Sequence, residues 1–144
     1  MIIGIDSSGK IDQLPCFIVG VRDDFCYCIE ITKINKAAII NEKHWKEKLT
    51  AAHMFKLIKK IYRKGDMIEI DDDFSGTKKE IIKYLDYLLR SYYQMEVLLR
   101  VSRDKWSKSV GRADKLSKFA RNGKLAVDLK NPDVSNEWNT ISKK

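Results

Sequence analysis

The sequence predicts an α/β fold in which helices flank one mixed sheet of five strands. Up to about residue 34, aromatic and β-branched residues come in short runs separated by turn residues, which is typical of strands. From about residue 41 onward, segments with a helical period alternate with two further short apolar runs. The predicted order of elements is βββαβαβα, and right-handed crossovers make the later strands parallel neighbours.

Three strands are expected first, at Ile2–Asp6, Pro15–Val21 and Phe25–Ile34. The segment Ser7–Lys10 is expected to be a turn, because small polar residues and glycine interrupt regular elements. The connections between these strands are short, so the three strands should form an antiparallel meander.

The first long helix is expected over about residues 41–64, where apolar residues recur at every third or fourth position. These residues are Trp45, Leu49, Ala52, Phe55, Ile58 and Ile61. A short strand follows at Met67–Ile70. Thr77, with Glu80 three residues later, has the spacing of a capping box and should begin the second helix.

The fifth strand is expected at Val97–Val101 and the third helix at Ser109–Asn122. Residues 125–129 could add one more short strand or pack across the sheet. We assign residues 1–130 to a single domain and residues 131–144 to a polar C-terminal tail.

The length of 144 residues fits one domain that buries about two-thirds of its unfolded surface. In the polar tail, Trp138 and Ile141 could act as anchors. The longest apolar runs have about four or five residues, whereas a membrane helix needs roughly 20. The N-terminus also lacks the basic and apolar pattern of a secretory signal. A cytoplasmic protein with no membrane partner is therefore expected.

The net charge of +8 results from 28 basic and 20 acidic residues. Basic residues are concentrated at residues 56–64 and 100–124. A positive field of this kind attracts polyanions and favours contact with nucleic acid. Lysine-rich surfaces also serve solubility, so charge alone does not decide between the two.

The three cysteines, Cys16, Cys26 and Cys28, are expected to be reduced and partly buried. Cys26 and Cys28 alternate with other strand residues and should point to the same face of the sheet. His44 and His53 are nine residues apart, which puts them on opposite faces of a helix and argues against a joint metal site. His53 is expected to be solvated.

Four aspartates are the candidate catalytic and metal-binding residues: Asp6, Asp71, Asp104 and Asp114. The first three follow predicted strands, at the sheet edge where α/β proteins usually bind substrates, and the fourth lies in the helix that comes next. Clustered carboxylates repel one another unless cations intervene. Oxygen ligands without histidine or cysteine suit Mg²⁺ or Mn²⁺. Together with the basic charge, this pattern predicts metal-dependent chemistry on a nucleic acid backbone, for which two cations about 4 Å apart can stabilise the attacking and departing oxygens.

Four basic residues near these aspartates are the predicted nucleic-acid contacts: Lys10, Arg103, Lys105 and Arg112. Lys10 and Arg103 in particular could hold phosphate oxygens.

Each aspartate also has a purely structural interpretation. Asp6 could accept hydrogen bonds from turn amides, and Asp71 could belong to a solvated acidic loop. Asp104 could pair with a neighbouring basic side chain, and Asp114 with Lys118 one helical turn later.

Four short segments resemble the motifs of a known family: Gly4–Lys10 (GIDSSGK), Lys48–Thr50 (KLT), Ile68–Asp71 (IEID) and Arg103–Trp106 (RDKW). In this order they resemble Gly-Ile-Asp-Glu-Ala-Gly-Arg, Lys-Leu-Thr, Val-x-Val-Asp and Lys-Ala-Asp-x-Lys-Tyr of the type-2 ribonucleases H. The resemblance covers roughly residues 1–121. The chain is thus similar to a shortened, divergent type-2 member of the ribonuclease H-like superfamily.

Members of this family cleave the RNA strand of RNA–DNA hybrids with Mg²⁺ or Mn²⁺. The resemblance implies that Asp6 bridges the metals, that Asp71 holds the ion that activates the attacking water, and that Asp104 completes the ligand set. It also implies the ribonuclease H-like five-stranded sheet.

The chain departs from the family pattern at several positions. Ser7 stands where the family has a glutamate, and Gly9–Ile11 lacks the second glycine of the family's Gly-Arg-Gly loop. Asp114 stands where the family's helix usually has serine, and it could restore the lost carboxylate from another direction. Three functions stay open at this point: a metal-dependent nuclease, an inactive nucleic-acid-binding module, and a protein–protein interaction domain on the same fold.

Overall fold

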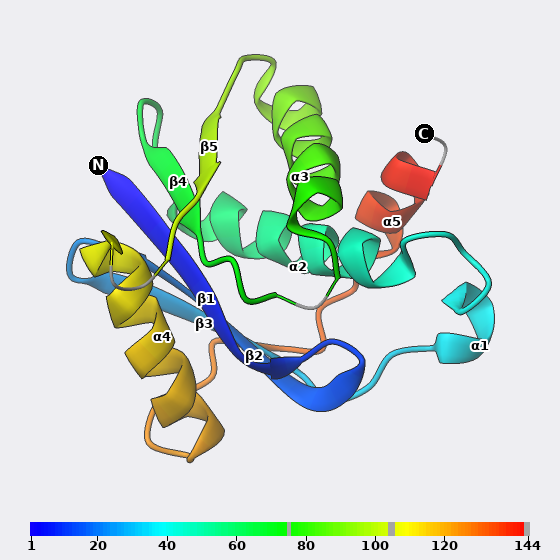
Figure 1. Cartoon of the computed structure of the whole chain (residues 1–144), viewed down its shortest axis with the longest axis horizontal. Helices are drawn as coiled ribbons and strands as arrows, with labels where there is room; N and C mark the ends of the chain where they lie inside the picture. The colour runs from blue at the N-terminus through cyan, green and yellow to red at the C-terminus, as the bar shows by residue number, and fades with distance from the viewer. Residues whose placement is uncertain (75, 104–105, 143–144) are drawn as a thin grey trace.

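The structure, a computed structural model, describes residues 1–74, 76–103 and 106–142, without the side chains of residues 36 and 37. The strands are β1 (Ile2–Lys10), β2 (Gln13–Arg22), β3 (Phe25–Ile31), β4 (Met67–Ile70), β5 (Leu98–Val101) and β6 (Leu129–Lys130). The helices are α1 (Lys36–Ile39), α2 (Trp45–Ile61), α3 (Lys78–Tyr93), α4 (Lys108–Arg121) and α5 (Ser135–Ser142). The elements form an α/β fold around one mixed sheet, which confirms the predicted class (Figure 1).

The sheet has the strand order β5-β4-β1-β2-β3-β6. β1, β2 and β3 form the expected antiparallel meander, and β4 and β5 add to it in parallel beside β1. The predicted count of five strands is wrong, because β6 pairs with Ile29–Glu30 of β3 as a sixth strand. The alternative that residues 125–129 add one more short strand is confirmed in part, since the strand lies at Leu129–Lys130. Two further bonds hold it there, from the amides of Asp128 and Asn131 to carbonyl oxygens of β3. A strand of two residues is too short for side-chain alternation to reveal it.

The turn predicted at Ser7–Lys10 is also wrong, because β1 continues to Lys10. The pairing of β1 with β2 is irregular between Ser8 and Lys10, and the connection lies at residues 11–12. The bulge allows the strand to continue through these small residues. The turn was predicted because small polar residues and glycine are typical of turns. The other predicted boundaries shift by a few residues, and the single-turn helix α1 was not predicted.

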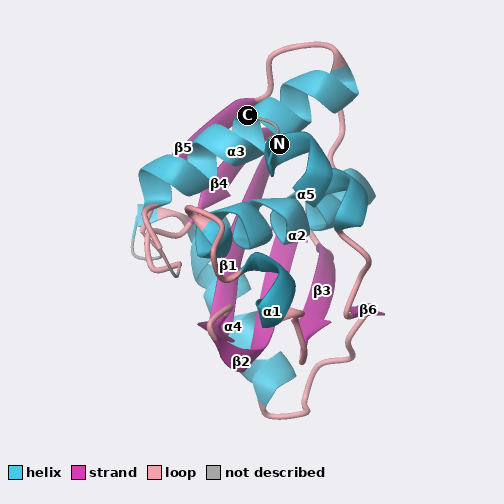
Figure 2. Cartoon of the chain, turned by 90° about the vertical axis from the view of Figure 1, so that its right-hand side faces the viewer, coloured by secondary structure: helices cyan, strands magenta, loops and turns pink. Residues whose placement is uncertain are grey.

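Helices cover both faces of the sheet (Figures 1 and 2). α2 packs on one face together with α3 and α5, and α4 packs on the other against β1 and β2. Glycines allow the close approach on both sides: a Cβ at Gly20 would overlap the Leu57 side chain of α2, and a Cβ at Gly4 would overlap the backbone of α4. The sheet therefore touches α4 through backbone at Gly4, and this contact fixes how α4 lies.

The C-terminal segment is docked on the domain. Ile141 of α5 is fully buried, and Trp138 packs against the main core. Glu137 is buried and lies 3.4 Å from Lys56 of α2. This packing covers one side of α2, so the expectation that His53 is solvated is wrong: the residue is 3% exposed. The helical pattern of α2 alone could not reveal which distant segment covers its polar side.

The three cysteines are free thiols, as predicted. Cys28 is buried in the smaller core under α4 and Cys26 packs against the same core, so the two share a face of the sheet. Among the described residues, no helix has the length and apolar character required to cross a bilayer.

A buried polar cluster attaches the start of α4 to the sheet. The hydroxyl of Ser107, the N-cap residue of α4, accepts a hydrogen bond from Val110 N and donates one to Glu69 Oε1 at 2.7 Å. Arg100 of β5 binds the other oxygen of Glu69 through two nitrogens, Nε at 2.6 Å and Nη2 at 2.5 Å. One serine therefore caps the helix and links it to two neighbouring strands.

Replacing Ser107 by alanine should lower the free energy of unfolding by about 2 kcal/mol or more, because the helix loses its cap and a buried carboxylate loses a donor. The matched control is Thr77→Ala at the N-cap of α3, where the threonine side chain makes no capping bond within the described residues. Its effect should stay within about 0.5 kcal/mol. Urea denaturation of both variants measures the difference, and equal losses would contradict the role given to Ser107.

Candidate active site at the carboxylate hollow

Strand register brings the first two candidate aspartates together. β1 and β4 are parallel, with Ile5 opposite Ile70, and the amide of Asp71 donates to Ile5 O at 3.0 Å. The next residue on each strand is an aspartate, so Asp6 and Asp71 are neighbours across the sheet. Ile5 and Ile70 face the core under α2, and therefore both aspartates face α4.

The contact at Gly4 brings the third aspartate to the same place. Gly4 lies against Ser109 and Val110 in the first turn of α4. Asp6 lies two residues beyond Gly4 along the strand, a distance of about 6–7 Å, and Asp114 lies four residues beyond Val110 along the helix, a distance of about 6 Å. The two aspartates are therefore displaced by nearly the same distance from the point where α4 touches β1. Asp114 therefore meets Asp6, and their carboxyl groups are hydrogen bonded.

These residues line a hollow of about 510 Å³, which we call the carboxylate hollow. Its lining residues are Asp6, Asp71, Asp72, Asp73, Arg103, Asp114 and Lys118. Asp6 and Asp71 are 5% and 7% exposed, so two carboxyl groups lie deep in the hollow. Arg103 bonds Asp72 at 3.1 Å and Lys118 bonds Asp114 at 3.1 Å, both at the exposed rim.

Burial and mutual repulsion perturb the deep carboxyl groups. Burial is the main cause that raises the pKa of Asp6 from 3.8 to about 8, and the charges of Asp71 and Asp114 raise it further. Burial also raises the pKa of Asp71, although the Asp73 amide partly offsets this. The raised pKa of about 8 favours a proton on Asp6 at neutral pH, which removes one of the three negative charges from the cluster of Asp6, Asp71 and Asp114.

The donor atoms are hard carboxylate oxygens, which suit Mg²⁺ or Mn²⁺. In the part of the chain that the structure describes, no group of three or more His, Cys, Asp or Glu side chains is already arranged around a metal position. The carboxyl groups of Asp6, Asp71 and Asp114 lie close enough to interact with one another. Asp104 and Lys105, both predicted site residues, lie outside the described residues.

Of the structural interpretations, the pair of Asp114 with Lys118 is confirmed, the solvated loop for Asp71 is wrong because the residue is 7% exposed, and Asp104 lies outside the described residues. Asp6 accepts a hydrogen bond from the Ser7 amide at 2.7 Å, and Asp71 accepts one from the Asp73 amide at 3.1 Å. Asp114 pairs with Lys118, one turn later on α4. Each carboxyl group thus has one protein partner, an amide or a surface lysine. One such partner does not remove the repulsion between the buried carboxyl groups, as the raised pKa of Asp6 indicates.

Not all predicted basic contacts reach the hollow. Arg103 does, but Lys10 is exposed at the far end of β1 and lines a separate small hollow with Ser7 and Phe74. Four residues of extended strand separate it from Asp6, about 13 Å. Arg112 does not line the hollow, and its positive charge acts on Cys26 of β3, where it partly offsets the rise in the thiol pKa that burial causes.

The sequence did not assign three residues of the hollow to the site: Asp72, Asp73 and Lys118. Asp72 and Asp73 follow Asp71 directly, and no pattern in the sequence distinguishes their roles from its role. Lys118 was noticed as a helix partner of Asp114, at the spacing of one turn. That spacing predicts an ion pair but not that the pair lies at the mouth of a site.

Comparison with protein-family models, with curated proteins and with solved structures found no match to this chain. The functional assignment therefore depends on the residues and their geometry.

The raised pKa of Asp6 predicts how stability depends on pH when no metal is present. The folded state keeps a proton that the unfolded state loses above its pKa of about 4, so the contribution of Asp6 to stability declines between pH 4 and pH 8. Asp6→Asn, which resembles the protonated form, should match the parent near pH 4 and exceed it in free energy of unfolding at pH 8. Denaturation at both pH values in the presence of a chelator measures this.

Asp66→Asn is the control of opposite sign, because Arg22 and the Arg63 amide help to lower the pKa of the Asp66 carboxyl. That variant should lose more stability, relative to the parent, at pH 8 than at pH 3. A stabilisation by Asp6→Asn that does not change between pH 4 and pH 8 would contradict a buried proton on Asp6.

Proposed function

We propose that this protein is a metal-dependent nuclease of the ribonuclease H-like fold, which cleaves a nucleic acid backbone with Mg²⁺ or Mn²⁺. One observation carries the proposal: three aspartates from separate elements, Asp6, Asp71 and Asp114, meet in one hollow with cationic side chains at its rim. Burying carboxyl groups in contact is unfavourable, and sites that do so commonly use the perturbed groups for chemistry.

The topology supports the ribonuclease H-like assignment. Apart from the single-turn helix α1, the elements from β1 to α4 follow the order βββαβαβα, and β4 and β5 are added in parallel beside β1. The segments that resemble type-2 ribonuclease H fall at compatible points: Asp6 within β1, Lys48–Thr50 in the first two turns of α2, and Asp71 directly after β4. This agreement in order and position supports a common ancestry with that family.

The three aspartates fit a magnesium or manganese ion by ligand type and by charge. When bound, such ions stabilise the attacking and departing oxygens of phosphodiester hydrolysis. Asp6 is central, because it contacts both other carboxyl groups. Asp104 remains a candidate further ligand, because it follows β5, the strand next to β4.

The basic residues would bind the substrate. Arg103 and Lys118 stand at the rim, where their cations can contact phosphate oxygens that approach the hollow. Lys105, shortly before α4 in the sequence, would extend this contact, whereas Lys10 and Arg112 do not line the hollow and could contact only more distant parts of a long substrate. RNA–DNA hybrid is the substrate class that the resemblance favours.

Asp114 is proposed to supply the third carboxylate of the site from α4, and not from position 7, where the resembled family has a glutamate and this chain has Ser7. Ser7 is directed toward a different hollow, beside Phe74, because successive residues of a strand point to opposite faces. A carboxylate at position 7 would thus leave β1 on the other side from Asp6. Asp114 instead approaches Asp6 from α4.

The test is cleavage of labelled RNA–DNA hybrid, RNA duplex, DNA duplex and branched DNA with Mn²⁺ or Mg²⁺. We expect cleavage of at least one substrate by the parent. Asp6→Asn, Asp71→Asn and Asp114→Asn should each lower the rate by about 100-fold or more, since changes even in the outer shell of a metal site reduce activity by about 10–100-fold. Asp86→Asn, which breaks an exposed pair with Arg90 on α3, is the control and should retain full activity.

Full activity of Asp114→Asn beside an inactive Asp104→Asn would contradict the role of Asp114 and leave Asp104 as the third ligand. If the parent cleaves none of these substrates but binds them in a salt-dependent manner, the protein is a nucleic-acid-binding module instead.

A further inference from the structure

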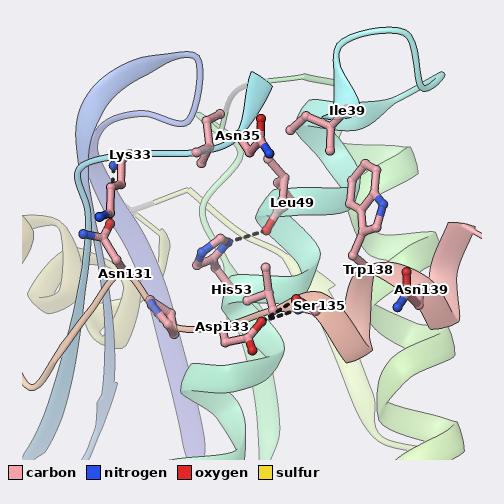
Figure 3. A pocket seen from close by; sticks show the side chains of 13 residues that line it. Lys33, Asn35, Ile39, Leu49, His53, Asn131, Asp133, Ser135, Trp138 and Asn139 are labelled. Carbon is pink, nitrogen blue, oxygen red and sulfur yellow. Dashed lines mark hydrogen bonds between the residues drawn. The ribbon is translucent and has the colours of Figure 1, made fainter. Parts of the chain in front are cut away.

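A second pocket lies on the α2 side of the sheet, away from the carboxylate hollow (Figure 3). Three segments surround it: residues 33–39 after β3, the first half of α2, and residues 131–139 before and within α5. Its volume of about 680 Å³ lies within the roughly 300–1,000 Å³ typical of small-molecule sites. We call it the α2 pocket.

A buried histidine supplies a hydrogen-bond acceptor at this pocket. The Nδ1–H group of His53 donates to Leu49 O at 2.8 Å, so Nε2 of the neutral ring carries a lone pair (Figure 3). Burial lowers the pKa of His53, which keeps the ring neutral at neutral pH. His53 is 3% exposed and lines the pocket, so this acceptor suits an N–H donor of a bound molecule.

The other walls suit a flat ring with polar edges. The indole of Trp138 borders the pocket, and the Lys48 ammonium lies 5.7 Å from the centre of its ring. Leu49 adds an apolar surface, and the amides of Asn35 and Asn139 add donors and acceptors. An aromatic side chain beside hydrogen-bonding groups is the usual means of holding a nucleobase.

A cluster of lysines lies directly beside the α2 pocket. A hollow of about 440 Å³ shares Pro132 and Asp133 with the pocket and is lined by Lys56, Lys59 and Lys60. The Lys59 ammonium lies 5.1 Å from the centre of the Tyr92 ring, which also lines this hollow. Lys56 is paired with Glu137 at 3.4 Å, so Lys59 and Lys60 are the lysines that we assign to a phosphate.

Asp133 lies between these two regions. Hydrogen bonds from the hydroxyl and the amide of Ser135 lower the pKa of the Asp133 carboxyl, which is therefore ionised at neutral pH. An ionised carboxylate accepts hydrogen bonds from hydroxyl groups, such as those of a ribose. Three features therefore follow one another in space: the α2 pocket, which suits a flat ring, the Asp133 carboxylate, which accepts hydrogen bonds from hydroxyl groups, and the lysine cluster.

We infer that the α2 pocket and the adjoining lysine cluster form a binding site for a nucleoside monophosphate. The base lies against Trp138 with its edge toward His53, the sugar hydroxyls face Asp133, and the phosphate contacts the lysines. None of these residues lines the carboxylate hollow, so this site stands or falls independently of the proposed nuclease activity.

The test is calorimetric titration with AMP, GMP, CMP and UMP at low salt, with adenosine and ribose 5-phosphate as partial ligands. At least one monophosphate should bind, and each partial ligand should bind about tenfold more weakly or not at all. Trp138→Leu should weaken binding by about tenfold or more, because a base loses its stacking partner. Asn139→Ala and Lys60→Gln are exposed changes that should weaken it by about threefold or more without affecting folding.

Lys79→Gln on α3 is the charge-matched control, and Asp6→Asn is the control for the other site; both should bind like the parent. The monophosphate recognised here can be a free nucleotide or the terminal nucleotide of a strand, and titration with a short single-stranded oligonucleotide distinguishes the two. If the oligonucleotide binds more tightly than the free monophosphate, and Lys60→Gln weakens that binding, the ligand is the end of a strand. The inference is overturned if no monophosphate and no oligonucleotide binds at millimolar concentration. It is also overturned if binding survives Asn139→Ala and Lys60→Gln but is lost in Asp6→Asn.

Discussion

The direct contact between the backbone of α4 and Gly4 is the constraint on which the candidate active site depends. Any side chain at position 4 would overlap Ser109 and Val110, so only glycine lets the helix lie this close to β1. The link from Ser107 to Glu69 fixes the same end of the helix to β4. Because the first turn of α4 is fixed at Gly4, the next turn of the helix places Asp114 beside Asp6.

The chain as a whole is positively charged, whereas the candidate active site is lined mainly by carboxyl groups. The chain carries a net charge of +8, yet Asp6 and Asp71 are buried side by side on the α4 face of the sheet. Such a pair lowers stability unless a proton or a cation is present, and Asp6 keeps a proton. A cost of this kind is typical of functional sites, where local stability is lower than the fold would allow. The surrounding positive charge would draw a polyanion toward the hollow.

Much of the fold could be predicted from the sequence, because its main signals are local. The change from strand to helical period near residue 41 predicted the meander and the later helices, and Met67–Ile70 was predicted at its observed boundaries. The errors arose where contacts between distant segments decide the structure. β6 exists because residues 129–130 pair with the edge of β3, and His53 is buried on the side of α2 that faces the C-terminal segment. Neither partner is visible from the local pattern.

The site was predictable to a similar degree. Aspartates that follow strands at one sheet edge pointed to Asp6 and Asp71, and register then made them neighbours. The meeting of Asp114 with Asp6 could only be suggested, because it depends on how α4 crosses the sheet, and that depends on Gly4. Lys10 shows the converse: nearness in sequence to Asp6 did not bring it to the hollow, because an extended strand carries its residues apart.

The most direct measurement is the number of protons released when Mn²⁺ binds, obtained by calorimetry near pH 7 in two buffers of different ionisation enthalpy. A cation that replaces the proton held by Asp6 should release about one proton per ion bound, and the release should decline above the raised pKa of about 8. Asp6→Asn should abolish both the binding and the release. Binding without proton release that is unchanged in Asp6→Asn, or no binding at millimolar Mn²⁺, would contradict a metal site at the three carboxyl groups.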